Sequence, residues 1–278
     1  MEDFGQTFRK LRTSLSISQT DLAKGIFDRS RLSRIESGVS YPSQQVASML
    51  ISRLGVSATE FEYIQRNYSA SKKEQILYHF FNISSNTEIE KINSLIKECS
   101  SIYNDDDIKR IRTVLQAQLL LSQQHNLSKA KKLVQPIWYN YLAKIKTLTI
   151  FDIALLNMIA YAFDNKTNIQ IITTILNEID NHYPFLKSLK CNTLINLANI
   201  HLDNHDIFLA KKTLTLAAKL AKENNQFEKL LLCKTELAFC DKNLQQTDYY
   251  INLLNEIGAS DIATVLKQQI KQLSYLFN

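Results

Sequence analysis

The chain has 278 residues, of which 45% are hydrophobic and 22% are charged, and this ordinary balance excludes a wholly disordered protein. Its formal net charge of +6 and its sequence pI near 9.0 suit a polyanionic partner without requiring one. No apolar run approaches the roughly 20 residues that span a bilayer. We therefore expect a cytoplasmic protein with no membrane partner.

Glycine and proline are scarce, and four of the five glycines lie in the first 55 residues. The remainder has few residues that form turns, so we expect it to be helical almost throughout. The cysteines follow no metal-ligand spacing, and we expect them to be buried thiols in a reducing compartment, with no metal bound. They are Cys99, Cys191, Cys233 and Cys240.

Five short segments of the first 66 residues carry apolar residues at helical spacing. Ser18 can cap the second of these helices, from Gln19 to about Lys24, and Gly25 can end it because glycine tolerates a left-handed conformation. The third helix begins near Asp28 or Ser30. Two short helices joined by a tight turn are the pattern of a helix-turn-helix.

The residues that carry a family resemblance extend through this whole segment. They are Leu11-Arg12, Ser18-Gln19, Leu22-Ala23, Ser30, Leu32-Ser33, Ile35-Glu36-Ser37-Gly38, Pro42 and Leu54-Gly55-Val56-Ser57. In this arrangement the segment resembles the Xre/Cro-type helix-turn-helix. The resemblance implies a DNA-binding domain in which Arg12 and Glu36 form a structural ion pair between the first and third helices.

The third helix would lie in the major groove, where arginine pairs with guanine in a bidentate manner. The candidates for reading bases are Arg29, Ser30, Arg31 and Arg34. The candidates for phosphate contacts are Ser18, Gln19, Ser40 and Tyr41. The alternative is that the arginines only form a solvated face. Residues 1–68 hold nine Lys or Arg and seven Asp or Glu, a net of +2, so one copy should bind weakly and need a second.

A polar stretch at 67–73 separates this domain, residues 1–66, from a second patterned region at 74–278. Helical periods there predict helices at about 72–83, 86–102, 106–124, 128–145, 149–164, 167–181, 185–203, 206–223, 227–242, 246–256 and 259–276. Pairs of them recur about every 40 residues, as in an α-solenoid. The clearest unit, Leu194 to Leu220, resembles a tetratricopeptide repeat. We predict an all-α chain with a five-helix DNA-binding domain followed by tetratricopeptide-like hairpins.

Polar residues form a stripe on one predicted helix face: Asn192, Asn196, Asn199 and Asp203 fall at i, i+4, i+7 and i+11. Asn157, Tyr161 and Asp164 repeat this pattern one unit earlier. Asparagine both donates and accepts hydrogen bonds, as an extended peptide backbone requires of its receptor. The stripes would equally suit a face exposed to solvent. For Trp138, Tyr139 and Tyr141 we favour core packing over a binding cage.

The combination of an Xre-type domain with helical repeats resembles the Rgg/GadR/MutR family of Gram-positive regulators, relatives of PlcR and PrgX. The resemblance implies a cytoplasmic homodimer that binds a two-fold site in double-stranded DNA. It also implies quorum-sensing control by a short hydrophobic signalling peptide in the concave groove of the repeats. The first domain lacks the cysteine that can link protomers in some relatives. The alternative is a regulator whose repeats recruit a protein partner instead of a peptide.

An enzyme is the least favoured class. The sequence has no Gly-rich phosphate loop, nucleophile elbow or HExxH motif. The one acidic run, Asp105 to Asp107, is explained by capping of the helix that follows. We therefore expect no catalytic residues and no cofactor.

Overall fold

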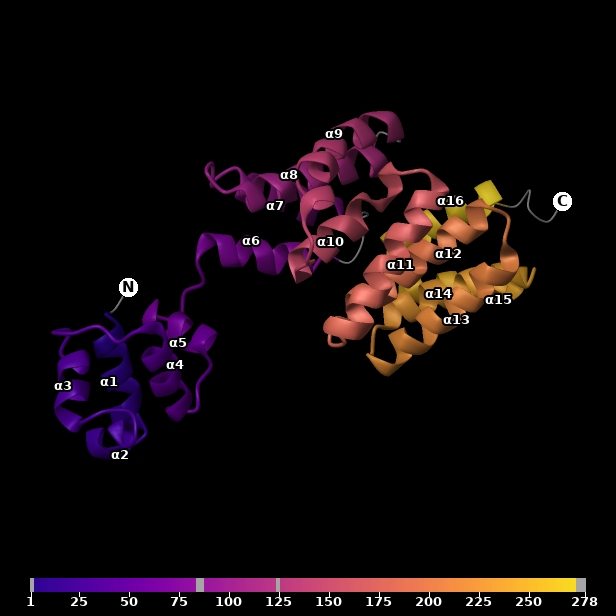
Figure 1. Cartoon of the computed structure of the whole chain (residues 1–278). Helices are drawn as coiled ribbons and strands as arrows, with labels where there is room; N and C mark the ends of the chain where they lie inside the picture. Colours follow the sequence, from indigo (N-terminus) through magenta and orange to yellow (C-terminus); the bar gives the residue numbers. More distant parts are fainter. Residues whose placement is uncertain (1–2, 84–87, 124–125, 274–278) are drawn as a thin grey trace. The chain divides into compact units, whose positions relative to one another are not determined.

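The computed structural model describes residues 3–83, 88–123 and 126–273. These residues form sixteen α-helices and two short 3-10 helices, and no strand occurs among them (Figure 1). The predicted all-α class is confirmed. The chain divides into two compact units, Met1–Gln75 and Ile76–Asn278. The division follows Gln75, two residues beyond the 67–73 stretch that we took as the linker.

Five helices make up the first unit, as predicted. They are α1 (Phe4–Ser14), α2 (Gln19–Ala23), α3 (Arg29–Glu36), α4 (Gln44–Arg53) and α5 (Ala58–Gln65). Each begins after a polar residue whose side chain accepts a hydrogen bond from a backbone amide of the first turn, which stabilises the helix start. These caps are Asp3, Ser18, Asp28, Ser43 and Ser57. The apolar faces meet in one core that includes Phe8, Leu22, Leu32, Leu50 and Phe61.

Two glycines are required by the geometry of this unit. Gly25 follows α2 with φ +77°, a left-handed conformation that other residues rarely adopt. Gly5 lies where α1 crosses α3, and a Cβ at this position would come within 2.1 Å of the Ile35 carbonyl oxygen. A side chain at position 5 would therefore push the first helix away from the third.

The second unit contains the remaining helices, and each predicted segment overlaps one of them; the predicted positions 86–87, 124 and 274–276 lie outside the described residues. They are α6 (Lys72–Phe81), which begins in the first unit, α7 (Ile89–Cys99), α8 (Asp106–Ser122), α9 (Leu127–Asn140), η1 (Leu142–Lys144), α10 (Ile150–Ile159), η2 (Ala160–Ala162), α11 (Asn165–His182), α12 (Lys187–Asp203), α13 (Ile207–Glu223), α14 (Phe227–Cys240), α15 (Leu244–Glu256) and α16 (Ser260–Leu273). α9 ends earlier than expected, at Asn140. The next residue, Tyr141, leaves helical geometry and its phenol donates a hydrogen bond to the buried Asp152.

Successive helices from α12 to α15 pack side by side, as expected of helical hairpins (Figure 1). Small buried side chains, among them Ala198, Ala210 and Ala217, allow α12 and α13 to approach closely. A separate core joins helices α6 to α11 and includes Ile111, Leu115 and Ile153. The second unit is therefore a stack of helical pairs, each buried against its neighbours.

Candidate functional site

Helix α3 presents its arginines to solvent. Leu32, Ile35 and Glu36 are buried, which leaves the opposite side of the helix free. All four predicted base-reading residues are exposed: Arg29, Ser30, Arg31 and Arg34. The guanidinium of Arg31 lies 5.3 Å from the centre of the Phe27 ring, a cation–π contact that restricts its orientation.

The start of α3 is fixed by Asp28. Its carboxylate accepts a hydrogen bond from the Arg31 amide at 2.8 Å and another from the Ser30 hydroxyl. These two bonds, the hydroxyl bond first, lower the pKa of Asp28. The Ser30 hydroxyl therefore gives its proton to the cap, so toward a base it is available as an acceptor.

The ion pair implied by the family resemblance is present. Arg12 Nε donates to Glu36 Oε1 at 2.6 Å and Nη2 donates to Oε2 at 3.0 Å, and both residues are buried. The hydrogen bond to Glu36 raises the pKa of Arg12 against the opposing effect of burial. A third bond, from Arg12 Nη1 to the Ile17 carbonyl at 2.7 Å, ties the pair to the turn before α2.

Gln19 has a role that the sequence did not reveal. We considered it for a phosphate contact, but its amide nitrogen donates to Glu36 Oε2 at 2.8 Å. Its amide oxygen accepts a bond from Arg29 Nε at 3.3 Å. A chain of hydrogen bonds thus leads from the buried Arg12 through Glu36 and Gln19 to an exposed arginine of α3. The pattern of single helices gives no sign of this bridge, because its members come from three helices.

The other phosphate candidates lie around α2 and after α3. Ser18 caps α2, where its hydroxyl oxygen accepts from the Asp21 amide at 3.0 Å. Ser40 is half-buried and its amide donates to the Arg34 carbonyl at 3.2 Å. Tyr41 is 74% exposed, so its phenol is free to reach a ligand.

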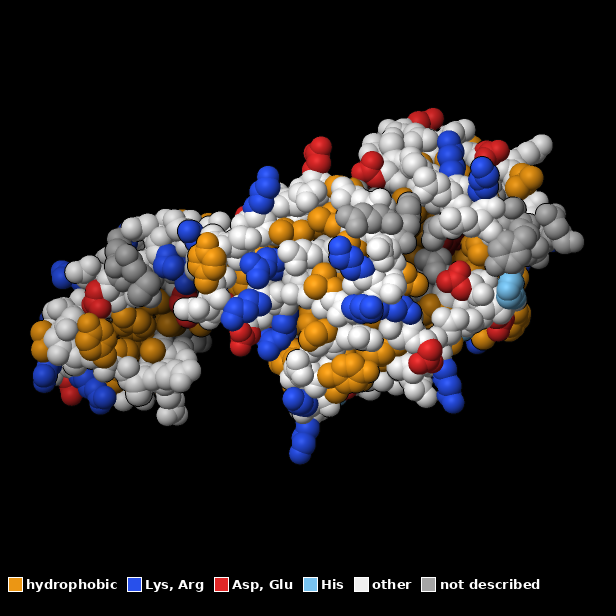
Figure 2. All heavy atoms as spheres, turned by 90° about the horizontal axis from the view of Figure 1, so that it is seen from above, with side chains coloured by type: hydrophobic (Ala, Val, Ile, Leu, Met, Phe, Trp, Pro, Cys, Tyr) orange, Lys and Arg blue, Asp and Glu red, His pale blue; other side chains and the backbone are white. Residues whose placement is uncertain are grey.

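Positive charge is not confined to the first unit. Residues 1–68 carry a net of +2, which leaves +4 of the total +6 for the rest of the chain. Figure 2 shows Lys and Arg side chains gathered on the face of the second unit that it presents.

The two predicted polar stripes meet in the second unit. Asn157 Oδ1, on α10, accepts bonds from Thr193 Oγ1 at 3.1 Å and from Asn196 Nδ2 at 3.4 Å, both on α12. We call the set Asn157, Tyr161, Asn192, Asn196 and Asn199 the asparagine face. Asn196 is exposed and the other four residues are half-buried.

Tyr161 contributes an unsatisfied polar atom to the asparagine face. Its phenol oxygen is buried and has no hydrogen-bond partner in the described part of the chain. Burial also raises the pKa of this phenol, so it is a neutral donor at physiological pH. A buried hydroxyl without a partner costs free energy.

The aromatic residues after Pro136, Trp138, Tyr139 and Tyr141, differ in their burial. Tyr141 is internal, because its phenol donates to Asp152 Oδ1 at 2.6 Å and Arg110 stacks 3.7 Å from its ring centre. The expectation of core packing is wrong for Tyr139, which is 63% exposed. Trp138 is half-buried and meets Phe163 edge to face at 5.0 Å.

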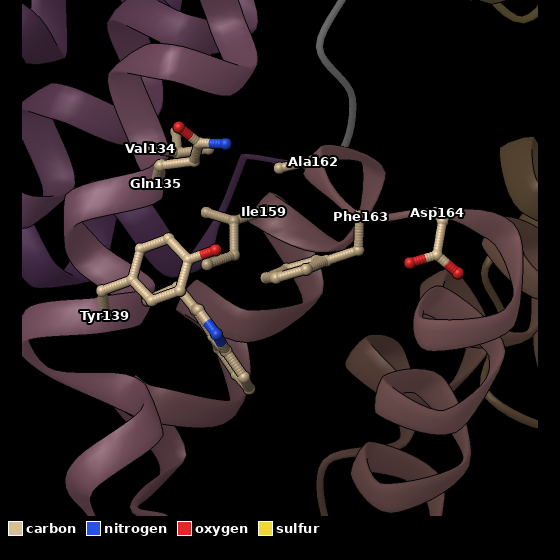
Figure 3. Close-up of a pocket in the computed structure, with 8 residues that line it drawn as sticks. Val134, Gln135, Tyr139, Ile159, Ala162, Phe163 and Asp164 are labelled. Carbon is tan, nitrogen blue, oxygen red and sulfur yellow. The ribbon is translucent and has the colours of Figure 1, made fainter.

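Trp138, Tyr139 and Phe163 line a pocket of about 200 Å³ (Figure 3). The other lining residues are Val134, Gln135, Ile159, Ala162 and Asp164. No group of three His, Cys, Asp or Glu side chains within the described ranges could hold a metal ion. None of the helices in those ranges is long and apolar enough to cross a membrane.

Residues 8–61 match the helix-turn-helix family. No curated protein matches the sequence. A proposed transcriptional regulator from Listeria monocytogenes EGD-e is similar in structure, with a TM-score of 0.68 and 17% identity over 98% of this chain and 97% of that chain.

Two further structures are similar over nearly the whole chain. One is Bacillus thuringiensis PlcR in complex with the peptide PapR7 and DNA, with a TM-score of 0.65 and 14% identity over 97% of this chain and 99% of that chain. The other is the Streptococcus dysgalactiae SHP pheromone receptor Rgg2, with a TM-score of 0.63 and 16% identity over 97% and 99%. The amino-terminal unit is therefore a helix-turn-helix DNA-binding domain of the Xre type, and the chain as a whole has the fold of PlcR and Rgg2, as the resemblance to the Rgg family predicted.

Proposed function

We propose that this protein is a cytoplasmic transcriptional regulator that binds a two-fold DNA site as a homodimer and responds to a short hydrophobic signalling peptide. In this proposal residues 1–66 bind DNA, and residues 74–278 bind the peptide and dimerise. The DNA-binding part of the proposal rests on helix α3. Its arginines are exposed, and its buried side is held by the ion pair of Arg12 and Glu36.

The arginines of α3 supply the chemistry for base recognition. An arginine that pairs with guanine O6 and N7 contributes about 1 to 3 kcal/mol of discrimination against the wrong base. Gln19 holds Arg29 at the start of the helix, and Phe27 restricts Arg31. Such restraint lowers the entropy lost when a flexible side chain binds.

The modest charge of the first unit supports dimerisation. A net of +2 over residues 1–68 gives one copy few phosphate contacts, and nonspecific affinity grows with their number. Two copies joined through the second unit would bind with avidity, provided that their α3 helices match the spacing of two half-sites.

The peptide half of the proposal is supported by the asparagine face. Asn157 on α10 and Asn196 on α12 lie within hydrogen-bond distance, so polar side chains of two helices meet there. Tyr161 adds a donor without a partner in the described chain. PlcR, which has the same fold, has been crystallised with a peptide and DNA.

Selection of DNA from a random duplex pool tests the first half. We expect the full-length chain to enrich a two-fold sequence, and Arg31→Ala with Arg34→Ala to abolish that preference. The control, Arg9→Ala with Lys72→Ala, removes the same charge at two exposed positions outside α3 and should weaken binding without changing the sequence selected. An unchanged preference in the α3 variant would contradict the assignment.

Thermal melting with a pool of short hydrophobic peptides tests the second half. We expect the pool to raise the melting temperature of the full-length chain and to change its DNA affinity, because a ligand that binds only the folded state stabilises it. Asn196→Ala should remove the effect. If no peptide changes the melting temperature or the DNA affinity, and one protein copurifies in stoichiometric amount, the repeats recruit that protein partner instead.

A further inference from the structure

A lysine from α14 lies at one end of the polar stripe on α12. Ser188 lies one turn before Asn192 on the same side of α12. Lys229, at the start of α14, extends to it: the ammonium nitrogen is 2.8 Å from the Ser188 hydroxyl oxygen and 3.3 Å from the Ser188 carbonyl oxygen. The positively charged ammonium group of Lys229 therefore lies at one end of the asparagine face.

The environment of Lys229 is unusual for a lysine. The residue is half-buried, and desolvation lowers the pKa of its ammonium. Its hydrogen bonds in the described part of the chain go to the neutral oxygens of Ser188. The charge of the adjacent Glu228 opposes the effect of desolvation only in part. A partly desolvated cation with a neutral partner gains free energy when an anion binds beside it.

The opposite end of the same stripe carries the opposite charge. Asp203 lies roughly four turns further along α12 on the same side, and desolvation raises the pKa of its carboxyl. A second carboxylate would be repelled there, whereas an ammonium group would be attracted. The stripe is thus polar from end to end, positive near Ser188 and negative near Asp203.

We propose that Lys229 and Ser188 form a carboxylate subsite at the end of the asparagine face, and that this subsite sets the direction of the bound peptide. The inference rests on the proposed function. The ammonium would form a charge-assisted hydrogen bond to the carboxylate, and the Ser188 hydroxyl would donate a second. The carboxylate comes from the peptide's C-terminus or from an acidic side chain.

A pool of short random-sequence peptides distinguishes these sources. Each sequence is prepared with a free and with an amidated C-terminus, in equal amounts, and is passed over the immobilised full-length chain. Retained peptides are counted by mass spectrometry. We expect free acids to exceed the matching amides by about tenfold, the effect of one hydrogen bond to a charged group. If amidated peptides that contain Asp or Glu are enriched instead, the same subsite takes a side-chain carboxylate.

Substitutions of Lys229 test whether the preference for peptides with a carboxylate depends on this subsite. Lys229→Gln should lose the preference for carboxylates and Lys229→Arg should keep it. The control is Lys219→Gln, which removes an equal charge from a side chain that is 75% exposed on α13, and it should behave as wild type. Equal retention of acids and amides by wild type with no enrichment of peptides that contain Asp or Glu, or a preference for carboxylates that survives in Lys229→Gln, overturns the subsite while leaving peptide binding intact. Retention of no peptide at all refutes the proposed function, and the subsite with it.

Discussion

Glu236 should make the stability of the second unit depend on pH. The residue lies on α14 with 4% of its surface exposed, and its Oε2 atom has no hydrogen-bond partner within the described ranges. Desolvation raises the pKa of this carboxyl from 4.5 to about 8. The folded chain therefore holds a proton on Glu236 that the unfolded chain releases at neutral pH.

The sign and size of the effect follow from linkage. Because the folded pKa lies above the unfolded one, the stabilisation is fully present below 4.5 and is lost as the pH rises toward 8. The slope within this window is about 1.4 kcal/mol per pH unit. Between about pH 6 and about pH 8 the free energy of unfolding should fall by about 2 kcal/mol.

Urea titrations of the full-length chain near these two pH values measure this slope. Glu236→Gln keeps the shape of the side chain but cannot ionise, so we expect its stability to vary much less with pH. The control is Glu228→Gln, an exposed position on the same helix, which should keep the wild-type slope. The comparison is confined below about pH 8, where the thiols of Cys233 and Cys240, whose pKa values are raised by burial, stay protonated.

The quantity that distinguishes the outcomes is the slope of the free energy of unfolding against pH, and not the absolute stability. Exchanging the buried acid for a buried amide changes stability by an amount that is constant with pH, and such an offset leaves the slope unaffected. If Glu236→Gln and wild type lose the same stability between the two pH values, Glu236 is ionised in the folded chain and the argument from desolvation is wrong.

Two further substitutions test the packing of each unit. Gly5→Ala should destabilise the first unit by about 1 to 3 kcal/mol, because the added Cβ would come within 2.1 Å of the Ile35 carbonyl oxygen; a melting curve unchanged from wild type would contradict this close approach. Tyr141→Phe should cost the second unit about 1 to 3 kcal/mol in urea titrations, because the buried Asp152 loses a hydrogen bond; Tyr139→Phe, at an exposed position, should change nothing, and equal effects of the two would refute the distinction.

The helices and the DNA-binding element were predictable because their signals are local. Caps such as Ser18 and Asp28 lie within one turn of the amides they bind, and apolar spacing shows which side of a helix is buried. The exposed arginines of α3 follow from the same spacing. Sequence pattern likewise grouped Asn192, Asn196 and Asn199 on one face, since residues one or two turns apart share a side of any helix.

Only the tertiary structure decided which faces meet. Asn157 contacts Asn196, and Lys229 reaches Ser188, across pairs of helices whose relative position no periodicity specifies. Within one helix and its end, spacing could not tell that Tyr141 turns inward while Tyr139 stays in solvent. The physical reason is that helical periodicity fixes directions around one axis, whereas contacts between helices depend on how the axes cross and on which side chains fill the space between them.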